Sequence, residues 1–114
     1  MKMKRYSIVP LTLYRCQSYK MPKLRERSIQ FSRGITSFDF KLGDNSLYNP
    51  AEGDIYLGPN GLSLRPLGVN LAELIGSFKG GYIYEIPKDT IVPDGLILIH
   101  ERTDHYSLQT KQSI

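Results

Sequence analysis

The clearest pattern of apolar and polar positions lies in the last third of the chain. Residues 82–87, YIYEIP, follow the alternation of a strand, and residues 96–102 and 105–111 form two further extended segments. Thr103 and Asp104 separate these two segments and suit a tight turn. The pattern therefore predicts three strands, two of them joined in an antiparallel hairpin.

The rest of the chain gives weaker signals. Residues 7–16 indicate an extended segment, and a short helix is expected from Pro22, because proline is favoured at a first helical position. Turn residues dominate between 38 and 59, which indicates short strands or a loop folded over a site. Residues 69–78 predict a helix capped by Asn70, with an apolar face of Leu71, Leu74, Ile75 and Phe78. The whole is typical of an α+β fold with strands in the majority.

Length and composition point to a single domain over residues 1–114. The chain has no internal repeat and no linker, and 40% hydrophobic with 23% charged residues is ordinary for a globular protein. No apolar stretch approaches the length of a membrane span, and the basic N-terminus lacks the apolar run of a signal peptide. If the protein leaves its cell, we expect a route other than the general secretory one.

Cysteine and histidine content argues against disulfides and metal sites. Cys16 is the single cysteine, and neither histidine has a partner at zinc-binding spacing. The chain also lacks a glycine-rich phosphate loop and a Gly-x-Ser-x-Gly nucleophile motif. We therefore expect no metal, no internal disulfide and no hydrolase of that type.

Positive charge is concentrated near the N-terminus. The net charge is +4, and much of the excess lies before residue 34. Such a region is either a solvated basic face or a surface that attracts a polyanion or a phosphorylated ligand. Because eight tyrosines are available for stacking on bases, the second alternative includes a non-enzymatic RNA-binding module.

Four polar elements stand out from this background. They are Arg15, Ser63, Tyr82 with Tyr84, and His105 with Tyr106. Each has a structural alternative: a paired strand arginine, a turn residue, packing aromatics and a surface histidine. Arg15 raises the sharpest question, since its guanidinium cannot lose its charge and a strand that buries it has to supply a partner.

The order of these elements resembles that of a known family. Residues 11–15, LTLYR, and 47–64, LYNPAEGDIYLGPNGLSL, are similar to the small ADP-ribosyltransferase-like toxins delivered by type VI secretion systems of Gram-negative bacteria. So are TIVPDGLILI at 90–99 and DHYSLQTK at 104–111. The resemblance implies an ADP-ribosyltransferase-like α+β fold, with two small antiparallel sheets around an NAD cleft and one or two short helices.

The resemblance also implies an activity and partners. We expect a toxin that binds NAD as its substrate and transfers ADP-ribose to a macromolecule, either protein or nucleic acid, in the cytoplasm of a target cell. A cognate immunity protein is a further expected partner. The remaining alternative is a non-enzymatic basic module that binds RNA or another protein.

By the same resemblance, three residues take the positions of a catalytic site. Arg15 is expected to anchor a phosphate or ribose of NAD, Ser63 to help position the nicotinamide half, and His105 to act at the nicotinamide ribose. Further contacts to NAD are expected from Tyr14, Tyr84 and Gln109.

The late strand departs from the family pattern. Well-characterised ADP-ribosyltransferases place a glutamate there as acceptor for the ribose 2′-hydroxyl, but no Glu-x-Glu pair occurs in this sequence. Glu85 and Glu101 lie at strand ends, so we expect both to be solvated. His105 shares a polar face with Ser107 and Gln109, opposite an apolar one; a cleft wall and a plain solvent face would both show this pattern.

Overall fold

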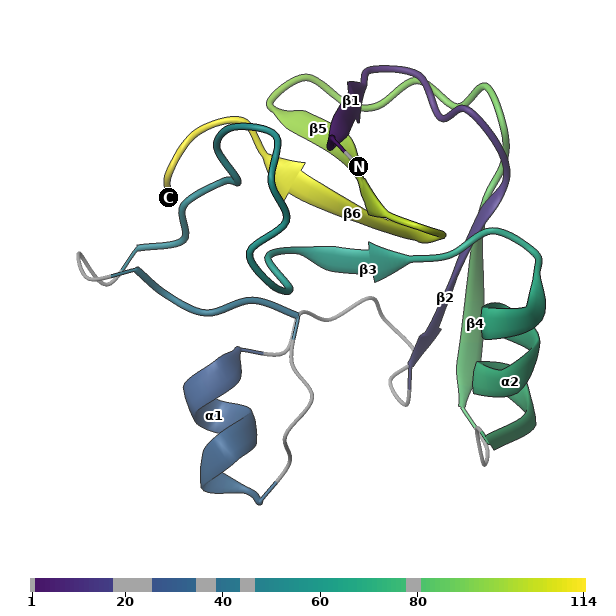
Figure 1. Cartoon of the computed structure of the whole chain (residues 1–114), viewed down its shortest axis with the longest axis horizontal. Helices are drawn as coiled ribbons and strands as arrows, with labels where there is room; N and C mark the ends of the chain where they lie inside the picture. The colour runs from purple at the N-terminus through teal and green to yellow at the C-terminus, as the bar shows by residue number, and fades with distance from the viewer. Residues whose placement is uncertain (1, 18–25, 35–38, 44–46, 78–80) are drawn as a thin grey trace.

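The computed structural model describes residues 2–17, 26–34, 39–43, 47–77 and 81–114, which form two antiparallel sheets and two short helices (Figure 1). The larger sheet has the order β1-β5-β6-β3, with bounds Lys4–Tyr6, Leu96–Arg102, His105–Thr110 and Leu62–Leu64. The smaller sheet pairs β2, Leu13–Gln17, with β4, Tyr82–Ile86. The helices are α1, Arg27–Ser32, and α2, Val69–Ser77. The predicted fold class is confirmed.

The strands of the last third follow the sequence prediction closely. β4, β5 and β6 occupy the three predicted segments, and a turn at Thr103 and Asp104 joins β5 to β6. Thr103 has a positive φ of 37°, which a β-branched residue adopts only under strain. The Asp104 carboxylate accepts a hydrogen bond from Arg65 at 3.0 Å, so the turn is held against the end of β3.

α2 departs from its prediction in two respects. It begins one residue before Asn70, so the prediction that Asn70 caps the helix is wrong. The Asn70 side chain instead donates a hydrogen bond to Asp104 at 2.9 Å. The predicted apolar face is also incomplete: Leu71 is buried, whereas Leu74 and Ile75 are exposed.

Two further expectations, Phe78 in the apolar face of α2 and Pro22 as a helix start, lie outside the described residues. Within the described residues, α1 begins after Glu26, whose carboxylate accepts a hydrogen bond from the Ile29 backbone N–H at 3.0 Å and so caps the helix.

The edge strand β1 was not predicted, because its three residues, KRY, show no alternation. Pairing with β5 makes this segment a strand. Across the described parts of the chain, no helix has the length and apolar character needed to cross a bilayer.

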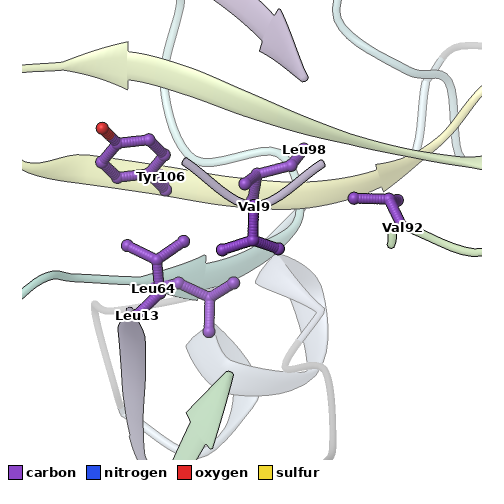
Figure 2. Close-up of a cluster of buried hydrophobic side chains, with 6 residues drawn as sticks. All are labelled: Val9, Leu13, Leu64, Val92, Leu98 and Tyr106. Carbon is purple, nitrogen blue, oxygen red and sulfur yellow. The ribbon is translucent and has the colours of Figure 1, made fainter. Parts of the chain in front are cut away.

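The two sheets meet where β2 passes the end of β3 (Figure 1). Tyr14 and Arg65 exchange backbone hydrogen bonds there, with N–O distances of 2.7 and 2.9 Å. An apolar cluster packs beside this junction, and Figure 2 shows its buried side chains: Val9, Leu13, Leu64, Val92, Leu98 and Tyr106. Three of them come from the larger sheet and Leu13 from the smaller, so the cluster fixes how the sheets pack.

One face of the larger sheet is apolar, and the other is polar along β3 and β6. Directly paired residues share a face, and on the apolar side those of β3, β6 and β5 are Leu62, Leu108 and Leu98. One residue along, on the opposite side, they are Ser63, Ser107 and Ile99. The predicted polar face of β6 is therefore confirmed, but it is buried rather than open to solvent.

Residues 47–61, here termed the covering segment, pack over the polar face. Gln109 Oε1 accepts a hydrogen bond from the Ala51 N–H at 2.8 Å, and Arg5 donates from Nη2 to the Ala51 carbonyl oxygen at 3.0 Å. Gly61 lies so close to β6 that an added Cβ would stand 2.7 Å from a backbone carbonyl oxygen of that strand. Glycine is therefore required where the covering segment enters β3.

Candidate functional site

Arg15 lies in β2 and is only 5% exposed. Its guanidinium forms a two-pronged ion pair with Asp39, Nη1 to Oδ1 at 3.2 Å and Nη2 to Oδ2 at 3.0 Å. Nε donates to Gln17 Oε1 at 2.8 Å, and Nη1 also donates to the Ser63 carbonyl oxygen at 3.3 Å. The bidentate geometry lets the two buried charges satisfy each other.

Asp39 supplies the partner that a buried Arg15 requires. The family resemblance gives Arg15 a phosphate or ribose of NAD to anchor, whereas in the structure Asp39 of the same chain neutralises the guanidinium. The sequence does contain a signal for Asp39, a carboxylate set between two phenylalanines in FDF at 38–40, because such an acid is rarely buried unless it is paired. The Asp39 carbonyl oxygen also accepts from the Gly61 N–H at 2.7 Å, which ties Arg15 to the covering segment.

Ser63 and His105 meet on the polar face of the larger sheet. Ser63 lies in β3, His105 begins β6, and 3.2 Å separates Ser63 Oγ from His105 Nε2. His105 is buried, whereas Ser63 keeps intermediate exposure. Since Arg15 contacts the Ser63 carbonyl oxygen, the structure brings together the three residues that the sequence singled out from β2, β3 and β6.

Near these residues, the burial of Glu101 is the main difference between the structure and the sequence prediction. It is 1% exposed, so the expectation of a solvated carboxylate is wrong. A β-bulge interrupts the β5–β6 register between His100 and Arg102, and bulges re-aim side chains. Glu101 Oε1 lies 2.9 Å from His105 Nδ1, yet in the described part of the chain neither atom has an aligned hydrogen bond. The contact is therefore a close approach of carboxylate and imidazole rather than a well-directed hydrogen bond.

Two tyrosines of the covering segment lie near this acid. Tyr56 makes an edge-on contact with the His105 ring, with a centroid distance of 6.1 Å, and the Arg102 guanidinium lies 4.9 Å over the Tyr56 ring. Tyr48 is buried and donates from its hydroxyl to a backbone carbonyl oxygen at 2.6 Å. Burial raises the pKa of both phenols, and the negative charge of Glu101 raises it further. Neither tyrosine was predicted as a site residue, although a loop folded over a site was one of the two alternatives predicted for their segment.

The other predicted NAD contacts differ in the strand face and strand position that they occupy relative to this cluster. Tyr84 pairs directly with Arg15 across β2 and β4, so the two side chains share a face. Tyr14 precedes Arg15 in β2 and therefore points to the opposite face. Gln109 lies toward the far end of β6 from His105, where its side chain holds the covering segment.

A cysteine nucleophile has little support here. Burial raises the pKa of the Cys16 thiol, and the positive charge of Arg15 opposes this only in part, so little thiolate is expected at neutral pH. Among the described residues, no three histidine, cysteine, aspartate or glutamate side chains are grouped as in a metal site. The groups that converge are a guanidinium, a hydroxyl, an imidazole and two carboxylates.

The structure has two small antiparallel sheets, with Arg15 on an early strand, Ser63 on a middle strand and His105 on a late strand. This is the arrangement that the resemblance to ADP-ribosyltransferase toxins implies. Residues 11–114 match the family model of the Tse2 ADP-ribosyltransferase toxin. The chain therefore belongs to the Tse2 ADP-ribosyltransferase toxin family. No curated protein and no solved structure matches it significantly.

Family membership confirms the resemblance drawn from the sequence. The protein is an NAD-dependent ADP-ribosylating toxin of a type VI effector family. The matched residues include β2, β3 and β6, which carry Arg15, Ser63 and His105. The alternative of a non-enzymatic RNA-binding or protein-binding module is accordingly set aside.

Proposed function

We propose that Arg15, Ser63 and His105 form the NAD site of this toxin. The observation that carries the proposal is their convergence from three strands. Arg15 Nη1 lies 3.3 Å from the Ser63 carbonyl oxygen, and His105 Nε2 lies 3.2 Å from the Ser63 hydroxyl oxygen. Polar groups held in a buried environment interact more strongly with a ligand charge than they would in water, which suits recognition of an anionic dinucleotide.

Arg15 anchors the pyrophosphate of NAD. A guanidinium fork binds a phosphate as it binds a carboxylate, through two parallel charge-assisted hydrogen bonds. Since Asp39 already holds that fork, the phosphate has to compete with Asp39 for it. Tyr84, on the same face of the smaller sheet as Arg15, contacts the same part of the ligand.

Ser63 and His105 act on the nicotinamide half. When the bond between ribose C1′ and the nicotinamide nitrogen breaks, positive charge grows on the ribose, and a group that accepts a hydrogen bond from a ribose hydroxyl stabilises it. A neutral imidazole has one nitrogen that can accept a hydrogen bond in this way. Ser63 adds a single neutral hydrogen bond, so Ser63→Ala should weaken transition-state binding by only about 0.5–1.5 kcal/mol.

Titration with NAD, followed by chemical shifts or thermal stabilisation, tests the site. We expect saturable binding by the wild-type protein and none by the double variant Arg15→Met/Asp39→Ala, which removes both charges of the buried pair at once. Arg15→Ala alone is a poorer test, because an unpaired Asp39 would cost about 3–5 kcal/mol of stability. Arg33→Ala, at an exposed arginine that ends α1, is the matched control and should bind NAD normally. Absence of any shift in the wild-type protein at millimolar NAD would refute the site.

The same proposal extends to the partners and place of action. The acceptor of ADP-ribose is a macromolecule, protein or nucleic acid, in the cytoplasm of a target cell reached by type VI delivery, and a cognate immunity protein protects the producing cell. Membership of the toxin family supports each of these points. Expression in the bacterial cytoplasm should arrest growth with the wild-type chain and be tolerated with Arg15→Met/Asp39→Ala at matched levels. Equal tolerance of both chains would contradict it.

A further inference from the structure

Glu101 is a buried acid to which the proposed function gives no role. It lies in the bulge of β5, and its Oε1 atom is 2.9 Å from His105 Nδ1. Among the described residues, neither of these two atoms has an aligned hydrogen-bond partner. Burying a carboxylate is costly, so its position against one imidazole nitrogen calls for a physical reason.

The two ring nitrogens of His105 face different kinds of group. Nδ1 faces the Glu101 carboxylate, which when ionised can only accept a hydrogen bond. Nε2 faces the Ser63 hydroxyl at 3.2 Å, which can either donate or accept. A neutral imidazole carries one proton, and the negative charge of the carboxylate 2.9 Å away attracts this proton to Nδ1, although the contact is not an aligned hydrogen bond. Nε2 then keeps the lone pair that accepts the hydroxyl hydrogen of Ser63.

We propose that Glu101 is a positioning residue, which holds His105 in the Nδ1–H tautomer with the Nε2 lone pair directed at Ser63. The inference rests on the proposed function, in which Ser63 and His105 act on NAD. It also locates the negative charge that the late strand lacks: Glu101 supplies it from β5, behind the imidazole. As His105 accepts a hydrogen bond or a proton, the adjacent carboxylate stabilises the positive charge that develops on the ring.

The second histidine of the chain is an internal reference. His100 Nε2 lies 2.7 Å from the Thr103 carbonyl oxygen. Because a carbonyl oxygen only accepts hydrogen bonds, His100 has to carry its proton on Nε2. The protein should therefore hold its two histidines in opposite tautomers, His100 as Nε2–H and His105 as Nδ1–H.

Long-range proton–nitrogen correlation spectra of the nitrogen-15-labelled full chain, recorded at neutral pH without NAD, test the tautomers. The wild-type protein should show one histidine of each kind, assigned with a His100→Gln variant. In Glu101→Gln only the His105 signals should move, toward a mixture of tautomers, because an amide can donate as well as accept. A wild-type His105 that is protonated on Nε2 or on both nitrogens would overturn the proposal, even if Glu101→Gln fails to fold. So would a His105 spectrum that Glu101→Gln leaves unchanged.

Turnover of NAD supplies a second readout. Glu101→Gln should lower kcat by about 10-fold or more and leave KM for NAD nearly unchanged, since Glu101 acts through His105 rather than on the ligand. Glu101→Asp, which keeps the charge, should restore part of kcat and the Nδ1–H tautomer. A loss confined to KM would contradict the positioning role. Because the tautomers are measured without NAD, a failure of NAD binding would be recognised separately as a failure of the proposed function.

Discussion

On one face of the larger sheet, apolar side chains pack against the smaller sheet; on the other, Ser63, His105 and Glu101 lie in a polar layer beneath the covering segment. Both faces contain fully buried side chains, since Leu64 and Leu98 are each 1% exposed on the apolar face and Glu101 is 1% exposed on the polar face. Burial alone therefore does not distinguish them. The difference lies in the kind of interaction, which is non-directional on the apolar face and directional on the polar face.

This difference explains where the proposed site lies. An apolar side chain can be replaced by another of similar volume at modest cost, because its contacts have no required direction. A buried polar group that loses its partner keeps the full cost of desolvation, about 1–3 kcal/mol and more for a charge. The polar face, and the Arg15–Asp39 pair that adjoins it through the Ser63 carbonyl oxygen, thus depend on specific partners, and these partners fix the orientation that chemistry on a ligand requires.

The largest loss of stability is expected when the Arg15–Asp39 pair is broken on one side. Asp39→Ala leaves the Arg15 guanidinium buried without its carboxylate, so the free energy of unfolding should fall by about 3–5 kcal/mol. Urea denaturation measures the loss. The double variant Arg15→Met/Asp39→Ala should recover most of it, because no unpaired charge remains. An equal loss in both variants would show that packing, not charge, dominates at this position.

The matching test of the apolar face is Leu98→Ala. Truncating this buried side chain should cost about 2–5 kcal/mol, from lost burial and from the cavity that remains. NAD binding per folded molecule should stay unchanged, since Leu98 faces away from Ser63 and His105. Leu67→Ala, at a leucine that is 74% exposed, is the control and should change stability by less than about 0.5 kcal/mol. Weaker NAD binding by folded Leu98→Ala would mean that the faces are coupled.

The closeness of the covering segment to the polar face can be tested at Gly61. Gly61→Ala should lower the free energy of unfolding by about 1–3 kcal/mol, because the new methyl group meets backbone atoms of β6. Gly68→Ala is the matched control, since no atom lies within 4 Å of a Cβ at that position. Thermal denaturation of the two variants measures the difference. Similar stabilities would indicate that the covering segment can move away from β6 at little cost.

The smallest effect concerns alkaline pH. Burial raises the pKa of Tyr48 in the folded protein, and the negative charge of Glu101 raises it further. A raised pKa favours the neutral phenol in the folded state, so this stability is complete below the unfolded tyrosine pKa of about 10 and is lost as pH rises above it.

Tyr48→Phe should therefore cost about 0.5–1.5 kcal/mol at neutral pH, through the lost hydrogen bond to the Asn60 carbonyl oxygen. It should also flatten the decline of stability above about pH 10. Urea denaturation across a pH series checks both effects. Identical slopes for wild type and variant would contradict the raised pKa.

Local signals in the sequence were enough to determine several elements of this protein. Alternation and the turn at Thr103 and Asp104 predicted β4 to β6, and they also predicted which face of β6 is polar, because side-chain direction reverses at each strand residue. The ordered positions of Arg15, Ser63 and His105, with the LTLYR segment, indicated the family that the match over residues 11–114 confirms.

Only the tertiary structure decided which polar groups become partners. Asp39 lies 24 residues from Arg15 along the chain, and Ala51 lies 58 residues from Gln109, so no local period encodes either contact. Strand alternation put Glu101 on a definite face, but whether that face meets water or protein depends on what packs over it. The burial of Glu101 follows from the covering segment and the bulge, which arise from long-range packing rather than from the pattern of the strand itself.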